Sequence, residues 1–214
     1  MPRLARVSPD RILEVAALEF AEHGFAGARV DRIARRAHVN KAMLYYHFKS
    51  KQRLYRSLLR SMFTLVATRL QTIAAGKGSP AVKVDRVISG MAAFIEEHPF
   101  FPAIMLREVA ERGTHLDRET LRALAAVPLA VAGIVAEGVA AGAFRPVHPV
   151  FAYFNMMAPI VFYLAGTPIR KEISHLHVID MRALSSADFV RQVQHATRRS
   201  LARHDGASLR QTTT

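Results

Sequence analysis

The clearest hydrophobic pattern lies in residues 29–51, where two short apolar repeats flank a few polar positions. The first repeat places three apolar side chains on one helical face: Val30, Ile33 and Ala34. Asn40 then offers a side-chain oxygen as the N-cap of a second helix, in which Leu44 and Phe48 lie four residues apart and face the core. Two short helices joined by a tight turn predict a helix-turn-helix.

Another helix is expected to precede this pair and to pack behind it. Ser8 is its predicted N-cap, Pro9 takes the first helical position, and Gly24 is a natural C-terminal stop.

Apolar residues keep helical spacing through the rest of the chain, and no segment alternates in the manner of a strand. The further expected helices span residues 51–75, 80–97, 100–112, 117–142, 149–166 and 186–203. Pro128 predicts a kink or a break, and residues 76–80, GKGSP, predict a linker. The sequence therefore predicts an all-α fold of about nine helices.

These elements predict two domains and a tail. Residues 1–50 would form a DNA-binding helix-turn-helix domain, and residues 51–203 a helical domain for ligand binding and dimerisation. The polar residues 204–214 are expected to be disordered.

The charge distribution agrees with a nucleic-acid partner. Of the formal net charge of +13, residues 1–60 carry the larger part, with 13 Lys or Arg against 5 Asp or Glu. A basic segment beside a helix-turn-helix favours a polyanion partner. The chain has no cysteine, which excludes disulfides and thiolate metal sites.

Three motifs carry a family resemblance: FAEHGF at 20–25, V-x-x-I-A at 30–34, and LYYHFKSK at 44–51. With these motifs the chain resembles the TetR family of bacterial transcriptional repressors. Two departures stand out. Ala28 and Arg29 occupy positions where the family often has a Thr or Ser cap, and His38 stands where it often has Gly, so His38 is expected to adopt a positive φ.

The resemblance implies which residues contact DNA. The expected contacts to base edges are Asn40, Lys41, Ala42 and Met43. The expected contacts to the phosphate backbone are Arg29, Arg32, Tyr45, Tyr46, His47 and Lys51. For Tyr45 and Tyr46 the alternative is that one of them belongs to the core.

A single short recognition helix reads few base pairs, so a two-fold dimer on an inverted-repeat operator is expected. The helices at 149–166 and 186–203 are the candidates for a four-helix dimer interface, as in similar proteins. The expected interface residues are Phe151, Phe154, Phe189, Val193, Ala196 and Leu201. The alternative for the helix at 149–166 is a central core helix.

Met and Phe side chains in the helical domain predict a pocket for a small apolar or aromatic inducer. The expected lining residues are Met62, Phe63, Val66, Met91, Phe94, Phe101, Met105, Met157 and Phe162. Each of these residues, taken singly, fits an ordinary core equally well. We therefore keep a second hypothesis, a helix-turn-helix protein without an inducer that a protein partner controls.

No pattern of an enzyme is present. The sequence lacks a Gly-rich phosphate loop, a G-x-S-x-G elbow and the H-E-x-x-H spacing, so neither catalysis nor a cofactor nor a metal is expected. The histidines lack the helical i, i+4 spacing of such a metal site, so a metal-sensing role is only the weaker alternative. They are His98 beside two glutamates, His115 near Asp117, and the pair His175 and His177 in an expected loop.

A long apolar stretch at residues 150–166 approaches the length of a membrane span. Asn155 and Pro159 interrupt this stretch, which favours a helix buried in protein. The expectation is a cytoplasmic protein with no membrane partner.

Overall fold

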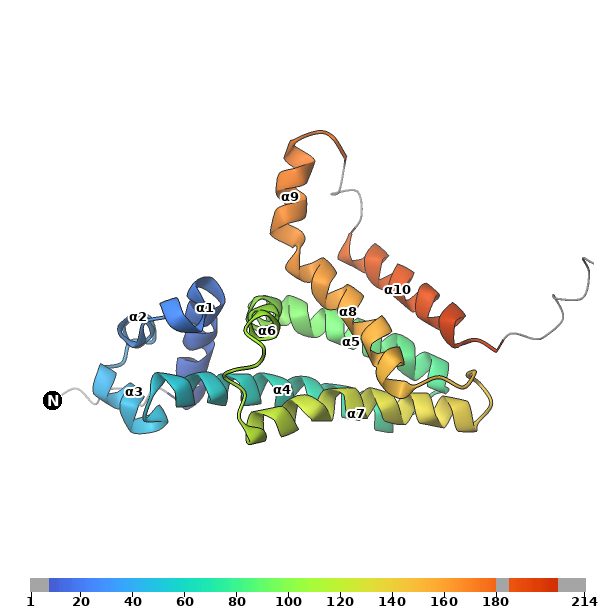
Figure 1. Ribbon diagram of the computed structural model, residues 1–214, viewed down its shortest axis with the longest axis horizontal. Coiled ribbons are helices and arrows are strands. Elements are labelled where there is room, and N and C mark those ends of the chain that lie inside the picture. Colours follow the sequence, from blue (N-terminus) through green and yellow to red (C-terminus); the bar gives the residue numbers. More distant parts are fainter. Residues whose placement is uncertain (1–7, 180–184, 204–214) are drawn as a thin grey trace, which may run out of the picture. The chain divides into compact units, whose positions relative to one another are not determined.

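The computed structural model describes residues 8–179 and 185–203 of the chain. Over these residues the fold is all-α, as predicted, and contains ten helices (Figure 1). They are α1 (Pro9–Gly27), α2 (Val30–Arg36), α3 (Lys41–Phe48), α4 (Lys51–Ala75), α5 (Pro80–Glu97), α6 (Phe101–Ala110), α7 (Arg118–Ala140), α8 (Pro149–Ala165), α9 (Thr167–His175) and α10 (Ser186–Leu201). The predicted tail at 204–214 lies outside the described residues.

Two details differ from the prediction. The additional helix is α9, whose Pro168 lies in its first turn, a position that tolerates proline. The expected loop around His175 and His177 is therefore wrong for His175, which closes α9. Of the kink or break expected at Pro128, the break is not found, since α7 continues as one helix through that residue, and the kink stays a prediction.

The chain forms two compact units. The first unit comprises Met1–Ala67 and Phe94–Val127, and the second comprises Thr68–Ala93 and Pro128–Thr214. This division passes through α4, α5 and α7, whereas the predicted domains divide the chain once, between residues 50 and 51. The predicted domain limits stay a prediction.

In the first unit, α1 begins as predicted. The Ser8 hydroxyl accepts a hydrogen bond from the Arg11 N–H, and Pro9 follows as the first helical residue. The apolar face of α1, with Ile12 and Phe20 fully buried, packs on α2 and α6. Gly24 has φ +66°, so the regular helix breaks at the predicted stop although helical turns continue to Gly27.

In the second unit, α8 and α10 run side by side (Figure 1). Ala152, Met156 and Ile160 form the buried face of α8. Gln194 of α10 donates hydrogen bonds to the Asp85 carbonyl at 3.0 Å and the Ser89 hydroxyl at 2.8 Å, both in α5. The Gln194 side chain thus connects α10, and with it α8, to α5.

Among the described residues, two segments are apolar and long enough for a membrane span by length and hydropathy alone. One is α7, and the other is α8 together with α9, which are bent by 53° relative to each other. Helices that pack inside water-soluble proteins meet the same criteria. The expectation of no membrane partner stays a prediction.

Candidate nucleic-acid interface

The turn between α2 and α3 has the geometry that the sequence predicts. His38 lies in the left-handed region with φ +56°, which confirms the expected positive φ. The Asn40 side-chain oxygen accepts a hydrogen bond from the Met43 N–H at 2.6 Å, which confirms Asn40 as the N-cap of α3. Leu44 and Phe48 are buried as expected and hold α3 against the rest of the unit.

Glu19 of α1 holds the start of α2, where the N-cap residue Arg29 makes no side-chain capping hydrogen bond. Its carboxylate accepts a hydrogen bond from the Arg29 N–H at 2.9 Å and another from Arg32 Nε at 2.6 Å. The Arg32 guanidinium also donates to the Gly27 carbonyl at 2.9 Å. A buried carboxylate ten residues earlier in the chain therefore fixes the beginning of the helix-turn-helix, a role that local sequence patterns do not reveal.

The charge of Glu19 is stabilised although its side chain is fully buried. Burial by itself raises the pKa of this carboxyl group, but the hydrogen bonds from the Arg29 N–H and the Arg32 guanidinium outweigh it, and the net pKa is lowered. Glu19 is therefore a carboxylate at neutral pH, and it attracts Arg36 at 3.6 Å as well.

The first turn of α3 forms an accessible edge. Asn40, Lys41 and Ala42 are exposed and Met43 is half-buried, so the four expected base contacts lie at one end of the helix. The Lys41 ammonium pairs with the Asp31 carboxylate of α2 at 2.9 Å. Hydrogen bonding to Asp31 raises the pKa of Lys41, which keeps this side chain charged.

The expected phosphate contacts fall into two groups. Tyr45 and Tyr46 are 38% and 72% exposed, so neither is a core residue, and His47 is half-buried. Lys51 already donates to the Ala26 carbonyl at 3.1 Å, which joins α4 to the end of α1, and burial lowers its pKa.

The two arginines among the expected phosphate contacts also differ in how free their side chains are. Arg29 is exposed, whereas the guanidinium of Arg32 is held by Glu19 and Gly27. Tyr45, Tyr46 and Arg29 are therefore freer to reach a phosphate than Arg32 and Lys51.

The expected inducer-pocket residues differ in exposure. Most are buried: Met62, Phe63, Val66, Met91, Phe94, Phe101 and Met157. Met105 is half-buried, and Phe162 is 75% exposed. Met62 and Phe94 line a cavity of about 210 Å³ in the first unit, with Asp10, Glu14 and His98 among its polar lining residues.

The expected dimer residues also divide by exposure. Phe151 and Phe154 of α8 are 66% and 57% exposed, and Ala196 of α10 is exposed too. Val193 and Leu201 are buried within the protomer. Phe189 is half-buried and stacks on the ring of Tyr163, with 3.8 Å between ring centroids.

Family profiles match both parts of the chain. The profile described as bacterial regulatory proteins, tetR family, matches residues 12–58. The profile described as tetracyclin repressor-like, C-terminal domain, matches residues 80–201, which is more than half of the chain.

Characterised proteins give the same result. The chain is similar to the HTH-type transcriptional repressor KstR2 of Mycolicibacterium smegmatis, at 33% identity over 172 residues that cover 76% of this chain and 82% of that protein. It is also similar to the HTH-type transcriptional repressor NicS of Pseudomonas putida, at 25% identity over 197 residues, 91% of this chain and 92% of that protein.

The fold is that of a solved regulator. The transcriptional regulator FadR from Bacillus subtilis, in complex with stearoyl-CoA, has a TM-score of 0.72 at 17% identity and covers 91% of this chain and 100% of that chain. The helix-turn-helix geometry, the two family profiles and the full-length relatives agree. This chain belongs to the TetR family of bacterial transcriptional regulators.

Proposed function

We propose that this protein is a homodimeric repressor that binds an inverted-repeat operator and releases it when a small apolar or aromatic inducer binds. The observation that carries the proposal is the accessible first turn of α3, with Asn40, Lys41 and Ala42 at its edge. In helix-turn-helix proteins the N-terminal residues of the second helix contact base edges in the major groove. Because the partner is chromosomal DNA, we infer a cytoplasmic location.

The exposed aromatic side chains of α8 support the dimer. Phe151 and Phe154 lie on the side of α8 that its neighbours leave uncovered, while Met156 and Ile160 face the protomer core. Large exposed apolar side chains on adjacent turns are typical of a protein interface. Ala196 on α10 adds a small exposed side chain that permits close helix approach.

A cavity in the first unit is the candidate site for the inducer. The cavity of about 210 Å³ in the first unit has the apolar residues Leu13, Met62 and Phe94 in its wall. Pockets for small ligands usually have about 300–1,000 Å³. An inducer would therefore have to enlarge this cavity. The relatives support an apolar ligand only by analogy, since FadR from Bacillus subtilis was solved with stearoyl-CoA.

The small cavity also favours the second hypothesis, that a protein partner rather than a small molecule controls DNA binding. A screen for operator release separates the two. An apolar compound that releases the operator and binds one site per chain supports the inducer. Release only by a cellular protein supports the alternative.

Selection of DNA from a random pool tests the central proposal. The full chain should enrich an inverted repeat whose half-sites are one helical turn or a multiple of it apart. Sedimentation of the protein on the selected DNA should give two chains per site. Enrichment of a single half-site, bound by one chain, would overturn the homodimeric repressor.

A further inference from the structure

A buried carboxylate in α6 has one oxygen without a hydrogen-bond partner. Glu108 is 1% exposed. Its Oε1 accepts a hydrogen bond from the Tyr55 hydroxyl at 2.7 Å and lies 2.9 Å from His115 Nδ1. Its Oε2 is buried and has no hydrogen-bond partner. A charged oxygen in that position costs folding free energy unless a donor or a cation occupies the space beside it.

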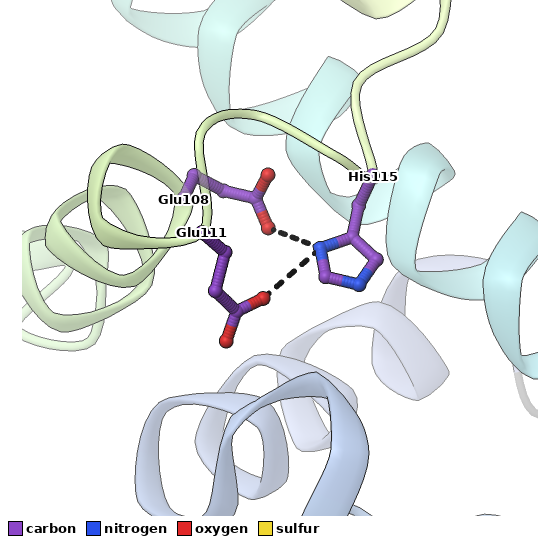
Figure 2. A group of neighbouring side chains, drawn as sticks. All are labelled: Glu108, Glu111 and His115. Atoms are coloured by element: carbon purple, nitrogen blue, oxygen red, sulfur yellow. Dashed lines mark hydrogen bonds and ion pairs between the residues drawn. The ribbon is translucent and has the colours of Figure 1, made fainter.

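The turn after α6 brings His115 back over this carboxylate (Figure 2). Arg112 and Gly113 both have positive φ, at +58° and +67°, and the Gly113 N–H donates to the Glu108 carbonyl at 2.7 Å. Arg56 Nε then donates to the His115 carbonyl at 2.9 Å and fixes the loop. The orientation of the imidazole is therefore determined by backbone geometry and a side chain of α4.

A second carboxylate completes the cluster. Oε2 of Glu111 lies 3.3 Å from His115 Nδ1, and the potential ligand atoms of the three residues all lie within 4.8 Å of one another. We propose that Glu108, Glu111 and His115 form a binding site for a first-row divalent metal ion, with Zn²⁺ as the ion that best suits one imidazole and two carboxylates.

The spacing fits such an ion. Ligand atoms of a tetrahedral zinc site, with bonds of about 2.0–2.2 Å, lie about 3.3 Å from each other. The Nδ1–Oε2 distance of 3.3 Å between His115 and Glu111 already has this value. The Glu108 carboxylate supplies the third ligand, since its Oε1 lies 2.9 Å from the same nitrogen, and water would fill the remaining position.

Charge and the surrounding residues favour the same assignment. Two carboxylates and a neutral imidazole balance the charge of a divalent ion, whereas an imidazolium without an ion would leave one negative charge in the cluster. The nearest α4 arginine, Arg56, pairs with Asp117 at 3.5 Å.

Tyr55 is a positioning residue for this site. Its side chain is buried, and burial followed by the hydrogen bond to Glu108 raises the pKa of its hydroxyl, so it stays a donor. Hydrogen bonds of this kind orient the ligands of metal sites. The ring of Phe25, at the end of α1, contacts His115 with 4.2 Å between ring centroids. The ion would thus join α6 and its loop, in the unit that carries the helix-turn-helix.

This inference goes beyond the proposed repressor function and does not depend on it. Asp117, which lies near His115 in the sequence, instead accepts hydrogen bonds from Thr120 at the start of α7. The ligands Glu108 and Glu111 were missed because α6 ends before His115, so the three residues share no helical face.

Calorimetric titration of the untagged, chelator-treated full chain with ZnCl₂ tests the site without DNA. The wild type should bind one Zn²⁺ per chain with a micromolar or tighter Kd, and Co²⁺ should give the visible absorption of a low-coordinate nitrogen and oxygen site. Glu108→Gln and His115→Gln should each weaken binding at least about tenfold. Zn²⁺ should raise the Tm of the wild type but not of either variant.

The double variant His175→Gln/His177→Gln is the matched control and should keep the wild-type affinity. If Glu108→Gln does not fold, Glu111→Gln at an exposed position carries the same comparison. The proposal is overturned if the wild type binds no Zn²⁺ at 100 μM, which is about a hundred times a micromolar Kd. It is also overturned if the ligand variants and the control bind Zn²⁺ equally.

Discussion

At the scale of single residues, Glu19 determines how the helix-turn-helix begins. Glu19→Gln keeps the shape of the side chain but removes the charge that Arg32 contacts at 2.6 Å. We expect this variant to lose about 2 kcal/mol of unfolding free energy at pH 7. Urea denaturation measures the loss.

The pH dependence follows from the lowered pKa of Glu19 in the folded state. Its stabilisation is complete above the unfolded value of about 4.3 and is lost as the pH falls through the folded pKa. The difference between wild type and Glu19→Gln should therefore shrink below about pH 4. Glu14→Gln, an exposed substitution on the same helix, is the control, and an equal loss there would contradict the assignment.

Lys41 and Tyr45 should differ in what they contribute to DNA binding. Lys41→Ala should weaken binding to the selected operator by about 1–3 kcal/mol, with little change on unrelated DNA, because a base contact is lost. Tyr45→Phe should weaken binding to all sequences alike, because a phosphate contact is lost. Fluorescence anisotropy at one fixed salt concentration measures both, and unchanged operator affinity in both variants would refute the residue roles.

At the scale of the elements, Gly138 permits the close return of the chain after α7. A Cβ atom at Gly138 would overlap the ring of Phe144, which is buried. Gly138→Ala should lower the unfolding free energy by about 1–3 kcal/mol, because the ring must move.

Gly133 in the same helix is the matched control, since a Cβ atom there meets nothing within 4 Å. Gly133→Ala should be neutral or stabilising by up to about 1 kcal/mol, as alanine favours helix. Thermal unfolding of the two variants gives the comparison. Equal changes in unfolding free energy for the two variants would mean that the Phe144 ring does not restrict the side chain at position 138.

Periodicity and capping predicted most elements but not the long-range contacts. The limits of α4 and α5 follow from apolar spacing and from Pro80, and Asn40 and His38 identify the turn. The helix α9 was missed because Gly166 and Pro168 resemble a break in the pattern.

The contacts that fix the candidate sites could not be predicted in this way. Glu19 accepts a hydrogen bond from the Arg29 N–H ten residues later in the chain, and His115 reaches Glu108 through a loop with two positive φ angles. Such pairs depend on how helices pack and loops turn, which spacing along the chain does not encode.

At the scale of the whole molecule, the exposed aromatic side chains of α8 determine the expected assembly. The double substitution Phe151→Glu/Phe154→Glu places charges where the proposal buries aromatic rings. It should convert the dimer to monomers and abolish operator binding at nanomolar protein. Sedimentation velocity and anisotropy measure the two effects.

Leu121→Glu is the control for this substitution, because Leu121 is an exposed apolar residue of the other unit. It should leave both the dimer and the operator affinity unchanged. A double variant that remains dimeric would place the interface elsewhere.

In the free protein, the Asp31 carboxylate neutralises the charge of Lys41. When the protein binds DNA, Lys41 leaves Asp31 and contacts the DNA instead. This lysine therefore releases fewer counterions from the DNA than its charge implies. Asp31→Asn should steepen the dependence of log Kd on log salt concentration by up to about one unit on the selected operator. Asp10→Asn, in the first turn of α1, should leave the slope unchanged. Asp31 would then set how strongly operator binding responds to the salt concentration around the protein.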